Sequence, residues 1–273
     1  MSNAHKNTIR ELEAQIKKNN ARTRRNMRKN KELLEAVHKL KEQMAALTPS
    51  TNPEPETIRP VRLHMLLDRS GSMSGLAEDV IGGFNSFVDK QRGLEGECYL
   101  NLVQFDSEDP FQVIYDNVAL DQVQTLTSEM YYPRAATPLY DALGSLITKG
   151  EQLQNQTPAD NVVWIFTDGL ENASTEYSAA KVKELVQQKE QEGWVFTFMG
   201  CDIDSYGASA ELGFSTANTS NFKKDQDGFD MAWHEIDRGF SSYRQKNSYD
   251  RNAMSDDFWE GEKNAERDLV ERS

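Results

Sequence analysis

The hydrophobic positions fall into two patterns, a seven-residue spacing near the N-terminus and, after it, short apolar runs that alternate with helical stretches. The seven-residue spacing covers residues 5–47. Its apolar members are Ile9, Leu12, Ile16, Leu33, Val37, Leu40, Met44 and Leu47, and its polar members are Asn19, Thr23, Asn26 and Asn30. A single helix of this length has no core of its own. The pattern therefore predicts a coiled-coil helix over residues 1–48 that forms a homodimer through residues 5–47.

A proline-rich segment separates this helix from the rest of the chain. Residues 49–57 hold three prolines and no apolar side chain, so they cannot continue a helix and favour a stiff, extended linker. We expect one folded domain over residues 58–246, followed by a charged and loosely held C-terminal tail over residues 247–273.

Apolar runs typical of buried strands alternate with amphipathic stretches typical of helices after the linker. The expected strands cover residues 61–67, 98–105, 111–120, 161–167 and 194–200, with a weak strand near 214–217, and the expected helices cover 75–92, 138–153, 178–192, 205–212 and 228–245. Only residues 106–110 join the second strand to the third, which is too short for a crossover helix, so these two strands form a hairpin. The predicted fold class is α/β, a Rossmann-like, doubly wound and mostly parallel sheet with one antiparallel edge strand.

Charge divides the chain at the same place. Residues 1–50 carry 12 basic and 5 acidic side chains, whereas the whole chain of 273 residues has a formal net charge of −13. The acidic remainder repels phosphate, which argues against a domain that binds polyanions. No stretch approaches the roughly 18 apolar residues of a membrane span. The N-terminus has no apolar leader, and Cys98 and Cys201 lie in apolar runs typical of buried thiols, so we expect a cytoplasmic protein.

The middle of the expected N-terminal helix is strongly basic. Residues 17–31 hold eight basic side chains and no acidic one. They resemble a basic leucine zipper only superficially, because Thr23 stands where that family has an arginine. Three interpretations remain open for this stretch, namely a solvated helix face, attraction to an acidic surface, and contact with nucleic acid.

Side chains with hard oxygen atoms follow the ends of two expected strands. Asp68 ends the first strand and is followed by Ser70 and Ser72, Asp168 follows the strand over 161–167, and Thr137 precedes a helix. In an open α/β sheet these strand ends meet at one edge, where ligands bind. Carboxylate and hydroxyl oxygens suit Mg²⁺ or Mn²⁺ better than zinc or copper. The five residues therefore predict a metal site with an exchangeable position for an incoming carboxylate.

This Asp-x-Ser-x-Ser motif, with the later threonine and the later Asp-Gly, resembles the metal-ion-dependent adhesion site of von Willebrand factor type A (VWA) domains. The resemblance covers residues 58–245, and the segments 137–143, 167–172 and 192–194 are similar to a bacterial and phage branch of that family. One departure is Ala135-Ala136, where many members have two glycines. That departure bears on the flexibility of the loop more than on metal binding.

The resemblance implies a function as well as a fold. It implies that Ser70, Ser72 and, depending on the state of the site, Thr137 hold a divalent ion directly, and that Asp68 and Asp168 act largely through water. It also implies that the ion recognises an acidic side chain of a protein partner and that no reaction follows.

Five residues beside the expected metal site are candidates for its partner-binding rim, namely Tyr131, Tyr132, Arg134, Glu171 and Asn172. Arg134 is positioned to attract the carboxylate of a partner. Ordinary surface placement is the alternative for the first three, and local ordering of the loop after Asp168 is the alternative for Glu171 and Asn172.

Three classes of function compete. The first is a binding module without enzymatic activity, dimerised by its coiled coil so that two sites act together. The second is a scaffold or assembly protein whose basic helix contacts an acidic surface or nucleic acid. The third is a Mg²⁺-dependent, phosphatase-like hydrolase with Asp68 as its nucleophile, although the sequence has neither a Gly-x-Ser-x-Gly elbow nor a phosphate-binding Gly-rich loop.

Overall fold

The computed structural model describes residues 59–201, 204–254 and 257–259. The expected coiled coil, the linker and residues 260–273 lie outside the described residues. Within the described part of the chain, no helix combines the length and the apolar character needed to cross a membrane.

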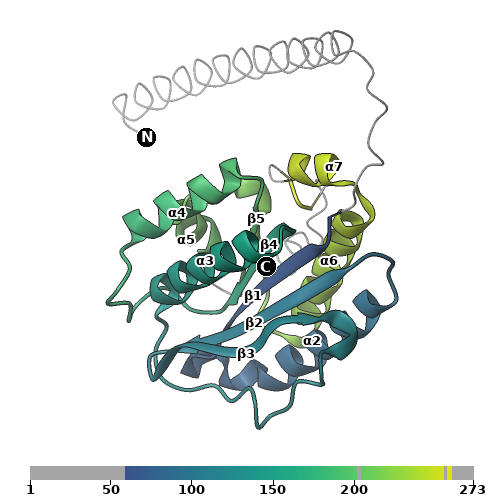
Figure 1. The fold of residues 1–273 in the computed structure, drawn as a ribbon. Helices are drawn as coiled ribbons and strands as arrows, with labels where there is room; N and C mark the ends of the chain where they lie inside the picture. Colours follow the sequence, from purple (N-terminus) through teal and green to yellow (C-terminus); the bar gives the residue numbers. More distant parts are fainter. Residues whose placement is uncertain (1–58, 202–203, 255–256, 260–273) are drawn as a thin grey trace, which may run out of the picture. The chain divides into compact units, whose positions relative to one another are not determined.

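Six strands form one sheet in the order β3-β2-β1-β4-β5-β6 (Figure 1). The strands are β1 (Val61–Asp68), β2 (Cys98–Asp106), β3 (Asp109–Ala119), β4 (Asp160–Thr167), β5 (Val195–Cys201) and β6 (Thr219–Phe222). All neighbouring pairs are parallel except β2 and β3, which form the predicted hairpin. The predicted α/β class, with its single antiparallel edge strand, is confirmed.

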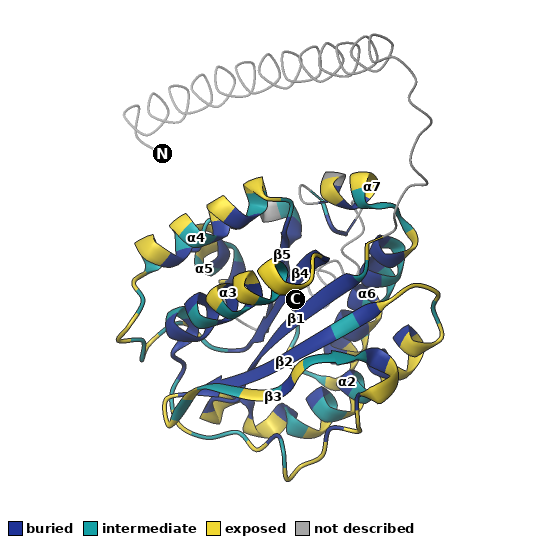
Figure 2. Ribbon diagram, viewed as in Figure 1, coloured by how far each residue is buried: buried dark blue, intermediate teal, exposed yellow. Residues whose placement is uncertain are grey.

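Helices cover both faces of this sheet (Figure 1). One face carries α2 (Ala77–Arg92) and α6 (Gln226–Gln245), and the other carries α3 (Leu139–Gln156), α4 (Ala179–Gln191) and α5 (Ser205–Glu211). Both faces of the sheet are therefore buried, and Figure 2 shows the central strands as buried while the outer sides of the helices are exposed. This burial explains why the strands appear in the sequence as nearly continuous apolar runs.

The last strand lies a few residues beyond its expected position. The sequence predicts it near residues 214–217, but Thr216–Asn218 forms a short 3-10 turn and β6 begins at Thr219. Phe214 misleads the prediction because its ring packs against Phe196 and Phe198 from a loop. The true strand is mostly polar, and its pairing with β5 rather than its apolar content identifies it.

The expectation of a loosely held tail is wrong for the described residues after 246. A short helix, α7 (Ser248–Ala253), follows α6, and its Arg251 is buried with an ion pair of 2.9 Å to Asp160 at the start of β4. Phe258 and Trp259 are also buried in the core on the α6 side of the sheet. Apolar residues in a charged stretch therefore extend the core beyond the predicted boundary at residue 246.

Helices α2 and α6 approach each other closely at one glycine. A Cβ atom on Gly83 would lie 2.1 Å from Nε1 of Trp233, whereas the space beside the neighbouring Gly82 is open. The Trp233 ring packs edge-on against Trp164 and stacks on Phe166, with ring centroids 5.1 and 5.8 Å away. The ring cannot yield without disturbing the aromatic core on this face of the sheet.

We expect Gly83→Ala to lower the free energy of unfolding by about 1 to 3 kcal/mol, because the added methyl group overpacks this contact. The matched Gly82→Ala variant should instead be unchanged or more stable by about 0.5 to 1 kcal/mol, since alanine is favoured over glycine inside a helix. Urea unfolding followed by tryptophan fluorescence measures both. Equal effects of the two substitutions would contradict the proposed packing.

Candidate functional site

The candidate site lies where two neighbouring parallel strands end. β1 and β4 pair in register, with Leu67 opposite Phe166, so Asp68 and the Thr167-Asp168 pair emerge at the same edge of the sheet. The chain leaves β1 for one half of the sheet and returns through β4 to build the other half. Ligands bind in α/β sheets at such a topological switch point.

Three of the predicted residues form a connected chain of hydrogen bonds at this edge. The Ser70 and Ser72 hydroxyl oxygens lie 3.0 Å apart, and the Ser72 hydroxyl donates to Oδ1 of Asp168 at 2.6 Å. Ser72 is exposed, whereas Ser70 and Asp168 are buried. Buried Met73 anchors the loop that carries the two serines. The structure thus brings these three side chains together at an accessible point.

Asp68 lies beneath them and is fully buried. Its Oδ1 accepts from the Ser70 backbone N–H at 2.7 Å, and its Oδ2 accepts from the Thr167 hydroxyl at 2.5 Å. Burial raises the pKa of Asp68 to about 6, while these hydrogen bonds act in the opposite direction and the nearby charge of Asp168 adds to the rise. The negative charge of Asp68 is therefore incompletely compensated by the chain itself.

Thr137 reaches the site from the loop before α3. An ideal Cβ on Gly169 would lie 3.0 Å from the Thr137 hydroxyl oxygen and 3.5 Å from Oδ2 of Asp68, so the two oxygens flank the same small space. Asn172 holds this threonine in place through two hydrogen bonds. Its side-chain oxygen accepts from the Thr137 backbone N–H at 2.9 Å, and its own backbone N–H donates to the Thr137 carbonyl at 3.1 Å. All five predicted metal ligands therefore lie around one point.

The sequence analysis missed one side chain at this point, Lys224. Its ammonium lies 2.6 Å from Oδ2 of Asp168 and 3.1 Å from the Ser72 carbonyl oxygen. The signal that could have identified it is its position just after β6, because the parallel strands β4, β5 and β6 all end at the same edge of the sheet. The error in the position of β6 concealed this relation.

The structure separates the predicted rim residues by burial. Tyr131 is only 1% exposed, so its assignment to the rim is wrong. Its hydroxyl donates to the Asp68 carbonyl at 2.5 Å and thereby supports the end of β1. Tyr132 is 43% exposed and remains a rim candidate. Leu170, which the sequence analysis did not select, is 53% exposed and directly follows the Asp168-Gly169 pair.

Arg134 belongs to a charge cluster beside the site that is buried at Asp106 and Arg69 and exposed at Glu108. Its guanidinium pairs with Asp106 and Glu108, each at 3.0 Å, and Asp106 also pairs with the buried Arg69 at 2.6 Å. Burial by itself would raise the pKa of Asp106, but hydrogen bonds from the Asp109 and Glu108 N–H groups and from Arg134, with the charge of Arg69, lower it below its usual value. Arg134 therefore clamps its loop to β2, which leaves its charge largely compensated within the chain.

Glu171 and Asn172 order the loop after Asp168, as one of the two interpretations of the sequence expected. The Glu171 carboxylate accepts from the N–H groups of Ala173 and Ser174 and from that of Tyr140 in the first turn of α3. These hydrogen bonds join the loop to α3, while Asn172 joins it to Thr137. Both side chains act on the site through other residues.

Ala135 occupies a backbone conformation that glycine adopts more easily. Its φ is +59°, in the left-handed region, and its carbonyl oxygen accepts from the Gly71 N–H at 3.0 Å. An alanine in this conformation costs about 1 kcal/mol more than a glycine would. This position is the one where the sequence departs from the double glycine of many VWA domains, and the hydrogen bond to Gly71 holds the loop in place despite the departure.

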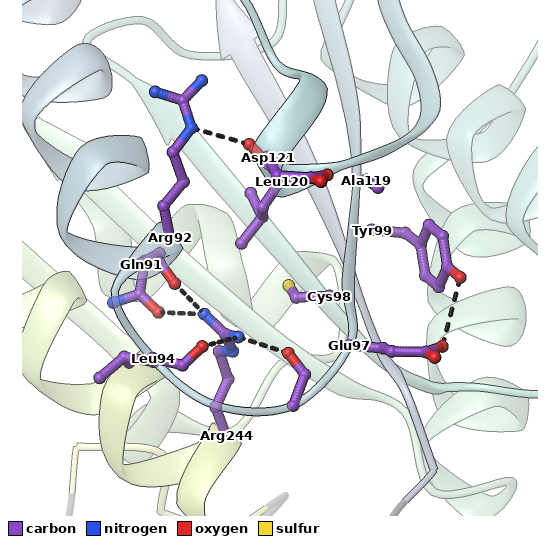
Figure 3. Close-up of a pocket in the computed structure, with 11 residues that line it drawn as sticks. Gln91, Arg92, Leu94, Glu97, Cys98, Tyr99, Ala119, Leu120, Asp121 and Arg244 are labelled. Carbon is purple, nitrogen blue, oxygen red and sulfur yellow. Dashed lines mark hydrogen bonds between the residues drawn. The ribbon is translucent and has the colours of Figure 1, made fainter.

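A pocket of about 460 Å³ lies at the opposite end of the sheet, around the start of β2 (Figure 3). Its buried Arg244 donates to the carbonyl oxygens of Gln91, Leu94 and Gly96. These acceptors lie at and beyond the end of α2, where backbone carbonyls have no partner within the helix. The guanidinium therefore completes the end of α2, and the pocket is remote from the cluster at Asp68.

The donor set is compatible with a hard divalent cation. Among the described residues there is no group of three or more histidine, cysteine, aspartate or glutamate side chains arranged for a metal, because this cluster combines two carboxylates with three hydroxyls. Oxygen donors of this kind suit Mg²⁺ or Mn²⁺. The Lys224 ammonium already provides one positive charge at Asp168.

Comparisons with known proteins support the fold. No protein-family model and no curated protein matches the sequence. Among solved structures, the pilus adhesin SpaC from Lactobacillus rhamnosus GG matches with a TM-score of 0.52 and 12% identity, over 68% of this chain and 30% of that one. At this identity the match shows a similarity of fold alone.

Two further structures are similar at lower TM-scores. A von Willebrand factor type A protein from Catenulispora acidiphila matches with a TM-score of 0.48 and 14% identity, over 66% of this chain and 42% of that one. The proximal thread matrix protein 1 of the mussel byssus, described with a zinc-occupied MIDAS motif, matches with a TM-score of 0.48 and 15% identity, over 67% and 46%. The chain thus spans less than half the length of each of these three structures.

We expect Asp106→Ala to lower the free energy of unfolding by about 3 to 5 kcal/mol, because it leaves the buried Arg69 guanidinium without its carboxylate. The matched variant Glu108→Ala removes the exposed partner of Arg134 and should change stability by less than about 0.5 kcal/mol. Urea unfolding of both variants checks this. Similar losses in the two variants would show that the buried charge does not hold these loops together.

Proposed function

We propose that this chain is a VWA-type binding module that binds a divalent cation, Mg²⁺ or Mn²⁺, and through it an acidic side chain of a protein partner. The observation that carries the proposal is the convergence of Asp68, Ser70, Ser72, Thr137 and Asp168 on one point at the switch of the sheet. The resemblance of their sequence motif to the metal-ion-dependent adhesion site supports the same conclusion.

Each residue has a distinct role in this proposal. Ser70, Ser72 and Thr137 provide neutral oxygens that hold the cation, while Asp68 and Asp168 provide its counter-charge, largely through water. The bound cation supplies a positive charge that attracts an anionic group. The raised pKa of Asp68 supports this assignment, because a carboxylate with incomplete compensation gains from a nearby cation.

The exposed surface beside the site suits a protein partner. Tyr132 and Leu170 are exposed on the loops that carry Thr137 and Asp168, and Ser72 is the accessible member of the hydroxyl set. Aromatic and aliphatic side chains exclude water around a polar contact and increase its contribution to binding. We propose that the partner places its acidic side chain at the cation and an apolar side chain against these two residues.

The other parts of the proposal concern the whole protein. We propose that the protein is cytoplasmic and that a coiled coil over residues 5–47 makes it a homodimer. Two linked sites would increase the apparent affinity for a partner that offers two targets. The proposed coiled-coil segment includes the basic stretch over residues 17–31. That stretch is the basis of the alternative scaffold function, in which the helix binds an acidic surface or nucleic acid.

We propose that the site performs no reaction. A hydrolase that used Asp68 as nucleophile would need one of its carboxylate oxygens to reach a substrate. The side chain is fully buried, and both of its oxygens accept hydrogen bonds from Ser70 and Thr167. The position of Asp68 therefore favours a supporting role over nucleophilic attack.

Mg²⁺ should stabilise the wild-type protein, and Asp68→Ala should abolish that stabilisation while the domain remains folded. A ligand at 100 times its Kd adds about 2.7 kcal/mol to the free energy of unfolding, which corresponds to a rise in Tm of roughly 5 to 10 °C for a domain of this size. Thermal melting with Mg²⁺ and with chelator measures the shift. Ser74→Ala is the matched control, since the exposed Ser74 hydroxyl lies on the same loop and donates to the Gly71 carbonyl. Equal shifts for all three proteins would exclude the site.

Partner binding should require both the cation and the site. We expect affinity capture from the native host to recover a protein with wild-type bait in Mg²⁺, and to lose it with chelator or with Asp68→Ala bait, because either change removes the positive charge that the partner recognises. Retention of the partner in chelator and by the Asp68→Ala variant would instead favour the scaffold function of the basic helix.

A further inference from the structure

The loop between β6 and α6 delivers a lysine to the proposed cation site. Only residues 223–225 separate the end of β6 from the start of α6, and both ends of the loop are anchored. Phe222 packs edge-on against Phe229 of α6, with ring centroids 4.9 Å apart, and the Asp225 side chain caps α6 by accepting from the Gly228 N–H. This short loop leaves Lys224 at the edge of the sheet, where β4 also ends.

The ammonium of Lys224 pairs with one carboxylate oxygen of Asp168. Oδ1 of this carboxylate accepts from the Ser72 hydroxyl, and Oδ2 lies 2.6 Å from the Lys224 nitrogen. The same nitrogen lies 3.1 Å from the Ser72 carbonyl oxygen. The Asp168 side chain is completely buried, while that of Lys224 is 34% exposed. A buried carboxylate requires a counter-charge, and the lysine provides it from the solvent side.

A divalent cation held by Ser70, Ser72 and Thr137 would need the same counter-charge. Asp168 accepts a hydrogen bond from Ser72 and pairs with Lys224. A divalent cation at the serine hydroxyls would therefore lie within a few ångströms of the lysine ammonium. Two positive charges at such a separation repel, and the repulsion is stronger beside buried groups than in water. The lysine side chain is long and partly exposed, so it can leave Asp168 without unfolding the loop.

We propose that Lys224 is a tethered competitor of the divalent cation. In the metal-free protein its ammonium neutralises Asp168, and it leaves that carboxylate when a cation binds. The affinity of the site is then set by the exchange of one positive charge for another, and metal-free protein remains folded because its buried carboxylate keeps a partner. This inference rests on the proposed cation site and assigns that site a built-in regulator.

Lys224→Met tests the competition, because methionine retains most of the length of the side chain without its charge. We expect calorimetric titration of the full-length variant with MgCl₂ to give a Kd about tenfold lower than that of the wild type, the effect of removing roughly one close ion pair. Lys223→Met is the matched control, since it removes an equal charge from the adjacent position in the same loop, and its Kd should lie within about twofold of the wild type. Lys224→Arg, which keeps the charge, should bind Mg²⁺ as weakly as the wild type.

Thermal melting provides a second readout that separates competition from a simple surface ion pair. In chelator, Lys224→Met should melt below the wild type because Asp168 has lost its counter-charge, and in saturating Mg²⁺ the two Tm values should converge. An equal loss of Tm in both conditions, together with an unchanged Kd, would overturn the proposal. If Lys224→Met does not fold, Lys224→Gln provides the same comparison with a polar, uncharged side chain.

The outcomes also separate this inference from the proposed function. If the wild type and all variants bind Mg²⁺ with one Kd, the role of Lys224 is wrong and the cation site stands. If none of them binds Mg²⁺ or Mn²⁺, both proposals are wrong.

Discussion

The rest of the site depends on one constraint: two carboxylates are buried from solvent at the ends of neighbouring parallel strands. Asp68 and the Asp168 side chain are fully buried, and each must be compensated by its surroundings. Thr167 and the Ser70 N–H donate hydrogen bonds to the first. Ser72 donates a hydrogen bond to the second, and Lys224 neutralises it. Burial still raises the pKa of Asp68 to about 6, and the proposed cation would add positive charge beside it.

The loops around the site are held by contacts that do not take part in binding. Arg69 and Arg134 both form ion pairs with Asp106. These ion pairs join the loop after β1 and the loop before Thr137 to β2. Glu171 and Asn172 join the Asp168 loop to α3 and to Thr137. Most of the polar side chains near the site therefore fix the position of other groups. A hydroxyl set held in this way loses little conformational entropy when it binds a ligand.

The exposure of these residues is the basis on which we propose recognition rather than catalysis. The charged groups lie inside, whereas a hydroxyl, Tyr132 and Leu170 lie outside. A partner would therefore meet apolar surface around a positive centre whose charge the buried carboxylates balance. Lys224 connects the exposed and the buried residues, since its side chain is 34% exposed and its ammonium pairs with a buried carboxylate.

Much of this protein could be predicted from local sequence, because buried strands and amphipathic helices carry their own periodicities and the hairpin is set by a five-residue connection. The proximity of Asp68, Ser70 and Ser72 to Asp168 was also predictable, since the parallel strands β1 and β4 must end at one edge, and the family motif added Thr137. The sequence did not reveal β6, the packing of Phe258 and Trp259, the burial of Tyr131 or the approach of Lys224 to Asp168. Each of these depends on contacts between residues far apart in the chain. Burial, and the compensation of a buried charge, depend on what surrounds a side chain in space, and only the tertiary structure decides that.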